Sequence, residues 1–154
     1  RITGGAAEFG GGITSEGDLT LTNVTVNGNA ARFGGGIFSR NGTVTGTAST
    51  FSGNEAADSG GGLYTLDSTC TLTGCLFTSN VASYGGAIHH QGSGAAPARL
   101  ALGSTTISGN SASNKGGGIF LDGPCLVELT DNEMHNNIAD IAGDEVFNTA
   151  PGCR

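Results

Sequence analysis

The feature that most constrains this chain is a Gly-rich sequence that returns about every 25 residues. Each copy ends in an aliphatic residue, and successive copies start 24, 26, 25, 31 and 26 residues apart. The copies are Phe9–Ile13, Phe33–Ile37, Ser59–Leu63, Tyr84–Ile88, Lys115–Ile119 and a degenerate sixth at Ile141–Val146. A repeat of this length is typical of a solenoid, in which each turn packs against its neighbours.

A second mark, an asparagine, precedes each later Gly pair by five or six residues. Apolar residues stand three, eight and ten positions before most of these asparagines, with a weaker column at five. A spacing of two is strand alternation, and the three-residue step between the columns at five and eight indicates a bend. With a third short strand at the aliphatic residue of the Gly mark, the pattern predicts an all-β, right-handed, single-stranded parallel β-helix of about five to six turns.

Both marks have a structural interpretation. Glycine allows a positive φ and a close approach of backbones at a bend that every turn repeats. Equivalent asparagines one turn apart can exchange amide hydrogen bonds along a ladder. The expected ladder consists of Asn29, Asn54, Asn80, Asn110 and Asn137.

Composition limits what the chain can do. The net charge is −7 and the six basic residues never cluster, which argues against nucleic-acid binding. No stretch approaches the roughly 20 apolar residues of a membrane span, so we expect no direct membrane insertion. Residues 1–154 are predicted to form a single domain, and the start at Arg1 suggests a processed product or part of a longer chain.

The paired marks resemble the polymorphic outer-membrane protein repeat of chlamydial-type surface adhesins and related extracellular proteins, with its motifs GGA[ILV] and FxxN. Gly85–Ile88 matches the first motif fully, Phe51–Asn54 and Phe77–Asn80 match the second, and the other turns are relaxed versions. The resemblance covers essentially the whole chain. It implies a secreted or surface-displayed passenger, often adhesive, that is cleaved from a larger precursor.

Four cysteines suggest an oxidising compartment. Cys125 lies six residues after Ile119 and Cys153 lies seven after Val146, which places both on neighbouring turns at nearly the same azimuth. Since neighbouring strands lie within disulfide reach, we predict a Cys125–Cys153 bond. Cys70 and Cys75 face inward in one turn and are either bonded across its bend or free core thiols.

Two N-glycosylation sequons begin at Asn23 and Asn41, both at expected bends. With the cysteines and the family resemblance, they favour an extracellular or cell-surface location.

A catalytic site is not visible. Parallel β-helices include enzymes that cleave polysaccharides, which need convergent acids or bases, but the acids here are scattered. His89 and His90 are adjacent on a strand and therefore point to opposite faces, so they cannot easily bind one metal ion. We expect no catalytic residue, metal or cofactor, and keep a polysaccharide-binding or polysaccharide-cleaving protein as the alternative.

One outward strand face carries a regular Thr-x-Thr array over three turns. It comprises Thr20 and Thr22, Thr45 and Thr47, and Thr71 and Thr73. Such arrays occur on ice-binding β-helices, but stacked threonines are also good strand surface. Ice binding is therefore a third hypothesis.

A column of aromatic residues follows the Gly mark and should point outward. It contains Phe38, Tyr64, His89, Phe120 and Phe147, with Phe9, Phe33 and Tyr84 beside it. An exposed aromatic row would bind a protein partner or sugar rings, unless neighbouring rings cover one another in a stacked ladder. The leading prediction is a non-catalytic extracellular structural or adhesive module. It would act through this column or by end-to-end or lateral self-association, with glycans as further candidate ligands.

Overall fold

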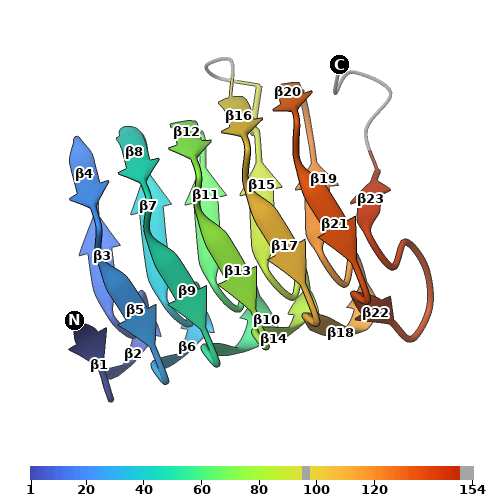
Figure 1. Cartoon of the computed structure of the whole chain (residues 1–154), viewed down its shortest axis with the longest axis horizontal. Helices are drawn as coiled ribbons and strands as arrows, with labels where there is room; N and C mark the ends of the chain where they lie inside the picture. Colours follow the sequence, from blue (N-terminus) through green and yellow to red (C-terminus); the bar gives the residue numbers. More distant parts are fainter. Residues whose placement is uncertain (95–97, 150–154) are drawn as a thin grey trace.

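The computed structural model describes residues 1–94 and 98–149, and every regular element within them is a β-strand. The chain winds into about six right-handed turns of about 26 residues each, which confirms the predicted fold class. Figure 1 shows the turns side by side, following the sequence from the N-terminus to the C-terminus along the long axis. All strand pairs of the described residues are parallel, and each strand inside a sheet pairs with its equivalents one turn before and one turn after.

Four sheets run along the described part of the solenoid, three with six strands and one with five, and each turn contributes no more than one strand to a sheet. The first contains β1 (Ile2–Thr3), β5 (Thr25–Asn27), β9 (Thr50–Ser52), β13 (Leu76–Thr78), β17 (Thr106–Ser108) and β21 (Glu133–His135). The second contains β2 (Ala6–Phe9), β6 (Ala30–Phe33), β10 (Glu55–Ser59), β14 (Val81–Tyr84), β18 (Ser111–Lys115) and β22 (Ile138–Ala139). The third contains β3 (Ile13–Ser15), β7 (Ile37–Arg40), β11 (Leu63–Leu66), β15 (Ile88–Gln91), β19 (Ile119–Asp122) and β23 (Val146–Asn148). The fourth contains β4 (Leu19–Thr22), β8 (Thr43–Thr47), β12 (Thr69–Thr73), β16 (Ala98–Gly103) and β20 (Cys125–Thr130).

The second sheet is the one that the sequence pattern did not predict, since the pattern gave three strands per turn. Its inward residues are alanines, of which Ala56, Ala82 and Ala112 are buried. An alanine gives little hydrophobic contrast against its small polar neighbours, so strand alternation is weak there. A register irregularity just before the Gly mark, between Ala56 and Ser59, disturbs the alternation further.

The interior is filled by the aliphatic and aromatic columns read from the sequence. Val26, Phe51, Phe77 and Ile107 occupy equivalent positions on successive turns and are 0% exposed. The rings of Phe51 and Phe77 stack with centroids 4.3 Å apart. Leu63, Ile88 and their equivalents face these residues from the third sheet, so a continuous core runs through the turns.

The asparagines form the ladder. Nδ2 of each donates to Oδ1 of the next, at 3.0 Å for Asn29 to Asn54 and 2.8 Å for Asn110 to Asn137. Each Oδ1 from Asn54 onward also accepts the backbone N–H of the preceding asparagine, and each Nδ2 donates to a backbone carbonyl one turn back. The five side chains are at most 3% exposed, so these bonds satisfy amide groups that water does not reach.

The Gly marks turn the chain between the second and third sheets. The first glycine of each mark is left-handed, as at Gly60 with φ +67° and Gly85 with φ +65°. The second allows close packing of turns, because a Cβ on Gly86 would lie 2.3 Å from the carbonyl oxygen of Gly117. Only glycine meets the second requirement without displacing the next turn.

Candidate functional site

Two columns of side chains flank the Gly marks on the outside of the solenoid. The leading column, which directly precedes each mark, contains Phe9, Phe33, Ser59, Tyr84, Lys115 and Ala142. The trailing column, which follows the aliphatic residue of each mark, contains Thr14, Phe38, Tyr64, His89, Phe120 and Phe147. Both point away from the core, as the alternation predicts.

The trailing column is nevertheless not an exposed apolar surface. Phe38, Tyr64, His89 and Phe120 are only 4–7% exposed. His89 stacks on Tyr64 with centroids 4.6 Å apart and meets Phe120 edge-on at 4.8 Å. The prediction of an open aromatic binding face is therefore wrong for these four residues, and the stacked ladder is what the structure shows. Phe9, at 41%, is the exposed ring of the set.

The rings of the trailing column pack against one another, and most of them are also covered by the leading residue of the preceding turn. Phe9 contacts Phe38 at 5.0 Å between centroids, and Phe33 contacts Tyr64 at 6.0 Å. Further along, Tyr84 contacts Phe120 at 5.2 Å. In the next turn the cover is a cation, because Nζ of Lys115 lies 4.8 Å from the ring centroid of Phe147.

Ser59 interrupts this pattern. Its place between Phe33 and Tyr84 would put a cover over His89, but a serine side chain is too small to provide one. A cavity of about 290 Å³ results. We call it the slot, and its lining residues are Phe33, Asp58, Ser59, Tyr64, Tyr84, His89, Gln91, Phe120 and Asp122.

The polar part of the slot is acidic and partly ordered by hydrogen bonds. The Tyr64 hydroxyl donates to Oε1 of Gln91, whose Nε2 donates to Oδ2 of Asp122 at 3.3 Å. Oδ1 of Asp122 accepts from Thr149 Oγ1 at 2.6 Å. Asp58 accepts from its neighbour Ser59 at 2.9 Å. Burial raises the pKa of Tyr64 to about 12, and the negative field of Asp122, Asp58 and Asp67 adds to the effect.

His89 is a neutral ring at the base of the slot. Burial lowers its pKa to about 3, against the weaker opposing effect of Asp122. Neither ring nitrogen has a hydrogen-bond partner among the described residues. A neutral imidazole between two aromatic neighbours acts mainly as another π-surface. On the opposite face of the strand, Nδ1 of His90 lies 2.6 Å from Oγ1 of Thr65, so the two histidines do not converge.

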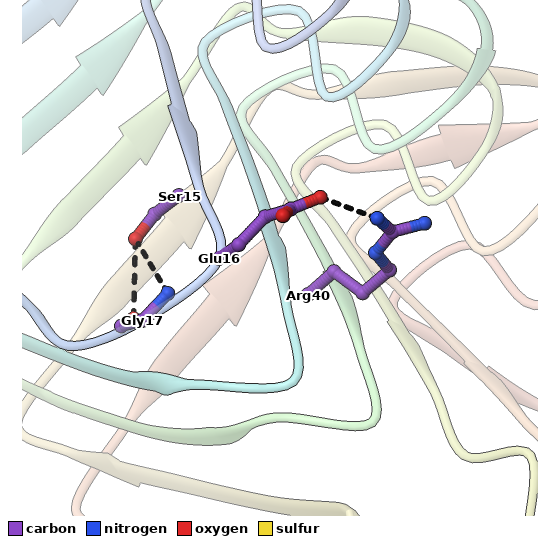
Figure 2. Close-up of polar contacts among 4 residues, drawn as sticks. All are labelled: Ser15, Glu16, Gly17 and Arg40. Carbon is purple, nitrogen blue, oxygen red and sulfur yellow. Dashed lines mark hydrogen bonds and ion pairs between the residues drawn. The ribbon is translucent and has the colours of Figure 1, made fainter.

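A smaller cavity lies on the same surface at the first two turns, and its charge differs from that of the slot. It has a volume of about 120 Å³ and lies among Phe9, Thr14, Glu16, Phe38 and Arg40. Figure 2 shows Arg40 and Glu16 pointing toward one another from neighbouring turns, where they form an ion pair. Charge is balanced in this cavity, whereas the described residues that line the slot include two aspartates and no Lys or Arg.

The structure describes three of the four cysteines, and two of them are free thiols. Cys70 and Cys75 are buried free thiols, so the alternative of a bond between them is not observed. Cys70 points into the core from β12, whereas Cys75 lies beyond the bend with its Sγ 3.7 Å from the carbonyl oxygen of Thr73. Cys125 is buried at the start of β20. Cys153 lies outside the described residues, so the Cys125–Cys153 bond stays a prediction.

Both sequon asparagines lie at the surface. Asn23 and Asn41 are exposed, and each has φ 54°, a left-handed conformation that asparagine tolerates well. The bends predicted at these positions are present, and a glycan on either side chain would extend into solvent. Their modification remains a prediction.

The threonine array is regular on the fourth sheet. Thr20, Thr45 and Thr71 are aligned across three strands, as are Thr22, Thr47 and Thr73 two residues further on. All six side chains are exposed. At β16 the array ends, where Ala101 and Gly103 take the equivalent positions.

Within residues 1–94 and 98–149, no three His, Cys, Asp or Glu side chains gather in a way that could hold a metal ion. No helix in the described part of the chain is long and apolar enough to cross a membrane.

Fold and comparison agree on the class of protein, a right-handed parallel β-helix. A family model described as "Right handed beta helix region" matches residues 10–150. The chain belongs to this family. No curated protein and no solved structure matches it. The more specific resemblance to the polymorphic outer-membrane protein repeat stays a prediction.

The predicted interaction surface contains five aromatic residues of the slot but none of its other polar residues; the five are Phe33, Tyr64, Tyr84, His89 and Phe120. Asp58, Ser59, Gln91 and Asp122 come from three turns, and no local motif joins them. One signal was available, because Ser59 stands where the neighbouring turns have Phe33 and Tyr84.

Proposed function

We propose that this chain is a non-catalytic extracellular β-helix module that adheres to its target through the slot over His89. The observation that carries the proposal is the missing cover at Ser59, since the neighbouring positions of the leading column hold rings or a cation. A group that enters the slot would lie against His89 between Phe33 and Tyr84. A recess lined by aromatic rings with a few polar groups is typical of a ligand site.

The proposal restricts adhesion to one region of the aromatic surface. Apart from the exposed ring of Phe9, the rings elsewhere cover one another and leave little area for a partner. The exposed sequon asparagines and the cysteines support an extracellular or cell-surface location. A polysaccharide-binding role agrees with the same site, because aromatic faces and carboxylates also recognise sugar rings.

A variant that fills the slot tests this function. Ser59→Phe places a ring between Phe33 and Tyr84, where it fills the slot. A ligand would then have to displace this ring, and fully burying a side chain of this size contributes roughly 1.5–3 kcal/mol. Retention of the chain on its target should therefore fall at least about tenfold. We would measure retention on immobilised dextran, pectin, chitosan and mucin, and assay the same polymers for depolymerisation. Ser113→Phe adds a ring to the same sheet at an exposed position outside the slot and serves as the control.

Equal retention of the Ser59→Phe variant and the unmodified chain would show that the slot is not the binding site. Release of new polysaccharide ends by the unmodified chain would instead establish the enzymatic alternative.

The aligned threonines favour a second candidate function, ice binding. Six exposed threonines, aligned in two columns across three strands, give a regular face. If this face binds ice, Thr45→Tyr at its centre should abolish most of the thermal hysteresis of the unmodified chain, because the ring would disrupt the regular face. Ser113→Tyr, on a different sheet, should leave it unchanged. An absence of thermal hysteresis in the unmodified chain would exclude this function.

A further inference from the structure

We propose that the ligand group recognised by the slot is an organic ammonium ion, such as a protonated amine or a quaternary ammonium. This inference rests on the proposed function and assigns the chemical class of its ligand.

Aromatic rings surround the space above His89 on several sides. Phe33 and Tyr84 flank the gap in the leading column, and Tyr64 and Phe120 flank His89 in the trailing column. The negative faces of such rings attract a cation placed within about 6 Å of their centroids. An arrangement of several rings around one small cavity is therefore suited to an alkylated ammonium group.

The charge of the slot has the sign that such a ligand requires. Asp58 and Asp122 reach the slot from two different turns, and none of its described lining residues is Lys or Arg. His89 is neutral at physiological pH, so it does not oppose a cation. A carboxylate ligand would meet like charges at Asp58 and Asp122. A neutral sugar could donate hydroxyl hydrogen bonds to these carboxylates but would gain no attraction between opposite charges.

The leading column itself shows a cation in the equivalent role. Lys115 is the leading residue of its turn, and its ammonium group covers Phe147 in the next turn at 4.8 Å. Arg32, next to the leading residue Phe33, lies 4.9 Å from that ring. A ligand ammonium over His89 would therefore repeat a contact that the chain makes two turns further on.

The experiment titrates the full chain with choline and with 3,3-dimethylbutan-1-ol, its uncharged analogue of equal shape. NMR shifts of Ser59, Tyr84 and His89 report occupancy. We expect choline to bind at least about tenfold more tightly than the alcohol, with an affinity that falls as ionic strength rises. Asp58→Asn should weaken choline binding about tenfold, while Asp18→Asn removes the same charge at an exposed position outside the slot and should have little effect.

Equal affinity for choline and the alcohol, or no binding of either choline or butylammonium, would overturn the ammonium assignment. If Ser59→Phe still abolished retention on a polysaccharide in that case, the slot would remain the adhesive site for a different ligand class. If Ser59→Phe changed neither retention nor choline binding, both proposals would be wrong. Asp58→Asn provides a second test that does not depend on how well a phenylalanine packs at position 59.

Discussion

Replacing Asn80 by leucine is expected to cause one of the largest losses of stability that a single substitution can produce in this chain. Asn80 stands in the middle of the ladder, where its Oδ1 accepts from the backbone and side chain of Asn54 at 3.1 and 3.0 Å. Its Nδ2 donates to Asn110 and to the carbonyl of Phe51, both at 2.9 Å. Leucine has a similar size but makes none of these bonds.

The cost arises from the groups that lose Asn80 as partner. The backbone N–H of Asn54 and the carbonyl of Phe51 would be left in an interior that water does not reach. Since each of these two groups costs about 1–3 kcal/mol, the free energy of unfolding should fall by roughly 2–6 kcal/mol. Urea unfolding followed by circular dichroism measures the change.

Asn27→Leu is the matched control. Asn27 belongs to β5 and accepts one surface hydrogen bond from Arg1, so its loss should change the free energy of unfolding by less than about 1 kcal/mol. A similar small effect at Asn80 would mean that the ladder contributes little beyond packing.

The second large effect is expected in mild acid. Burial lowers the pKa of His89 to about 3 and that of His90 to about 4 in the folded chain, whereas both titrate near 6.5 when unfolded. Below pH 6.5 the unfolded chain therefore binds protons that the folded chain does not, and stability falls as pH falls. The loss amounts to roughly 2–3 kcal/mol for each histidine at pH 4.5, or about 5 kcal/mol for the pair.

Unfolding free energies measured between pH 7 and pH 4.5 test this expectation. The double variant His89→Phe, His90→Leu carries the residues found at the equivalent positions of the next turn, Phe120 and Leu121, and should lose much less stability over that range. Identical pH profiles for the variant and the unmodified chain would show that the two histidines become protonated without unfolding.

Strands could be predicted from the sequence where the side chains that repeat from turn to turn are large and apolar. Columns such as Val26, Phe51, Phe77 and Ile107 alternate with polar residues and identify their strands directly. The alanine-centred strands of the second sheet, such as β14, lack that contrast and were missed. The asparagine ladder was predictable because the same residue type recurs at the same position in every turn.

The site was harder to predict because the exposure of an outward side chain depends on side chains of other turns as well as on its own strand. Alternation places Tyr64 and His89 on the outer side correctly, but both are buried because rings of neighbouring turns pack against them. Phe33 covers Tyr64, while Ser59 leaves the place over His89 empty. A periodic sequence pattern shows which side chains of one turn point outward. It does not show which side chain of another turn covers them.

The asparagine ladder also gives the solenoid a net dipole along its axis. In every asparagine amide of the ladder the Oδ1 accepts from the N-terminal side and one N–H of Nδ2 donates toward the C-terminal side, so the amide dipoles add along the axis, with the positive end at Asn137. A carboxylate is suited to that end, as it is to the N-terminus of an α-helix, and Asn137 Nδ2 donates to Oε2 of Glu145. At the opposite end, Oδ1 of Asn29 accepts the backbone N–H of Gly5 at 3.0 Å. Whole turns could therefore be inserted or deleted between these two caps without reversing the polarity of the line.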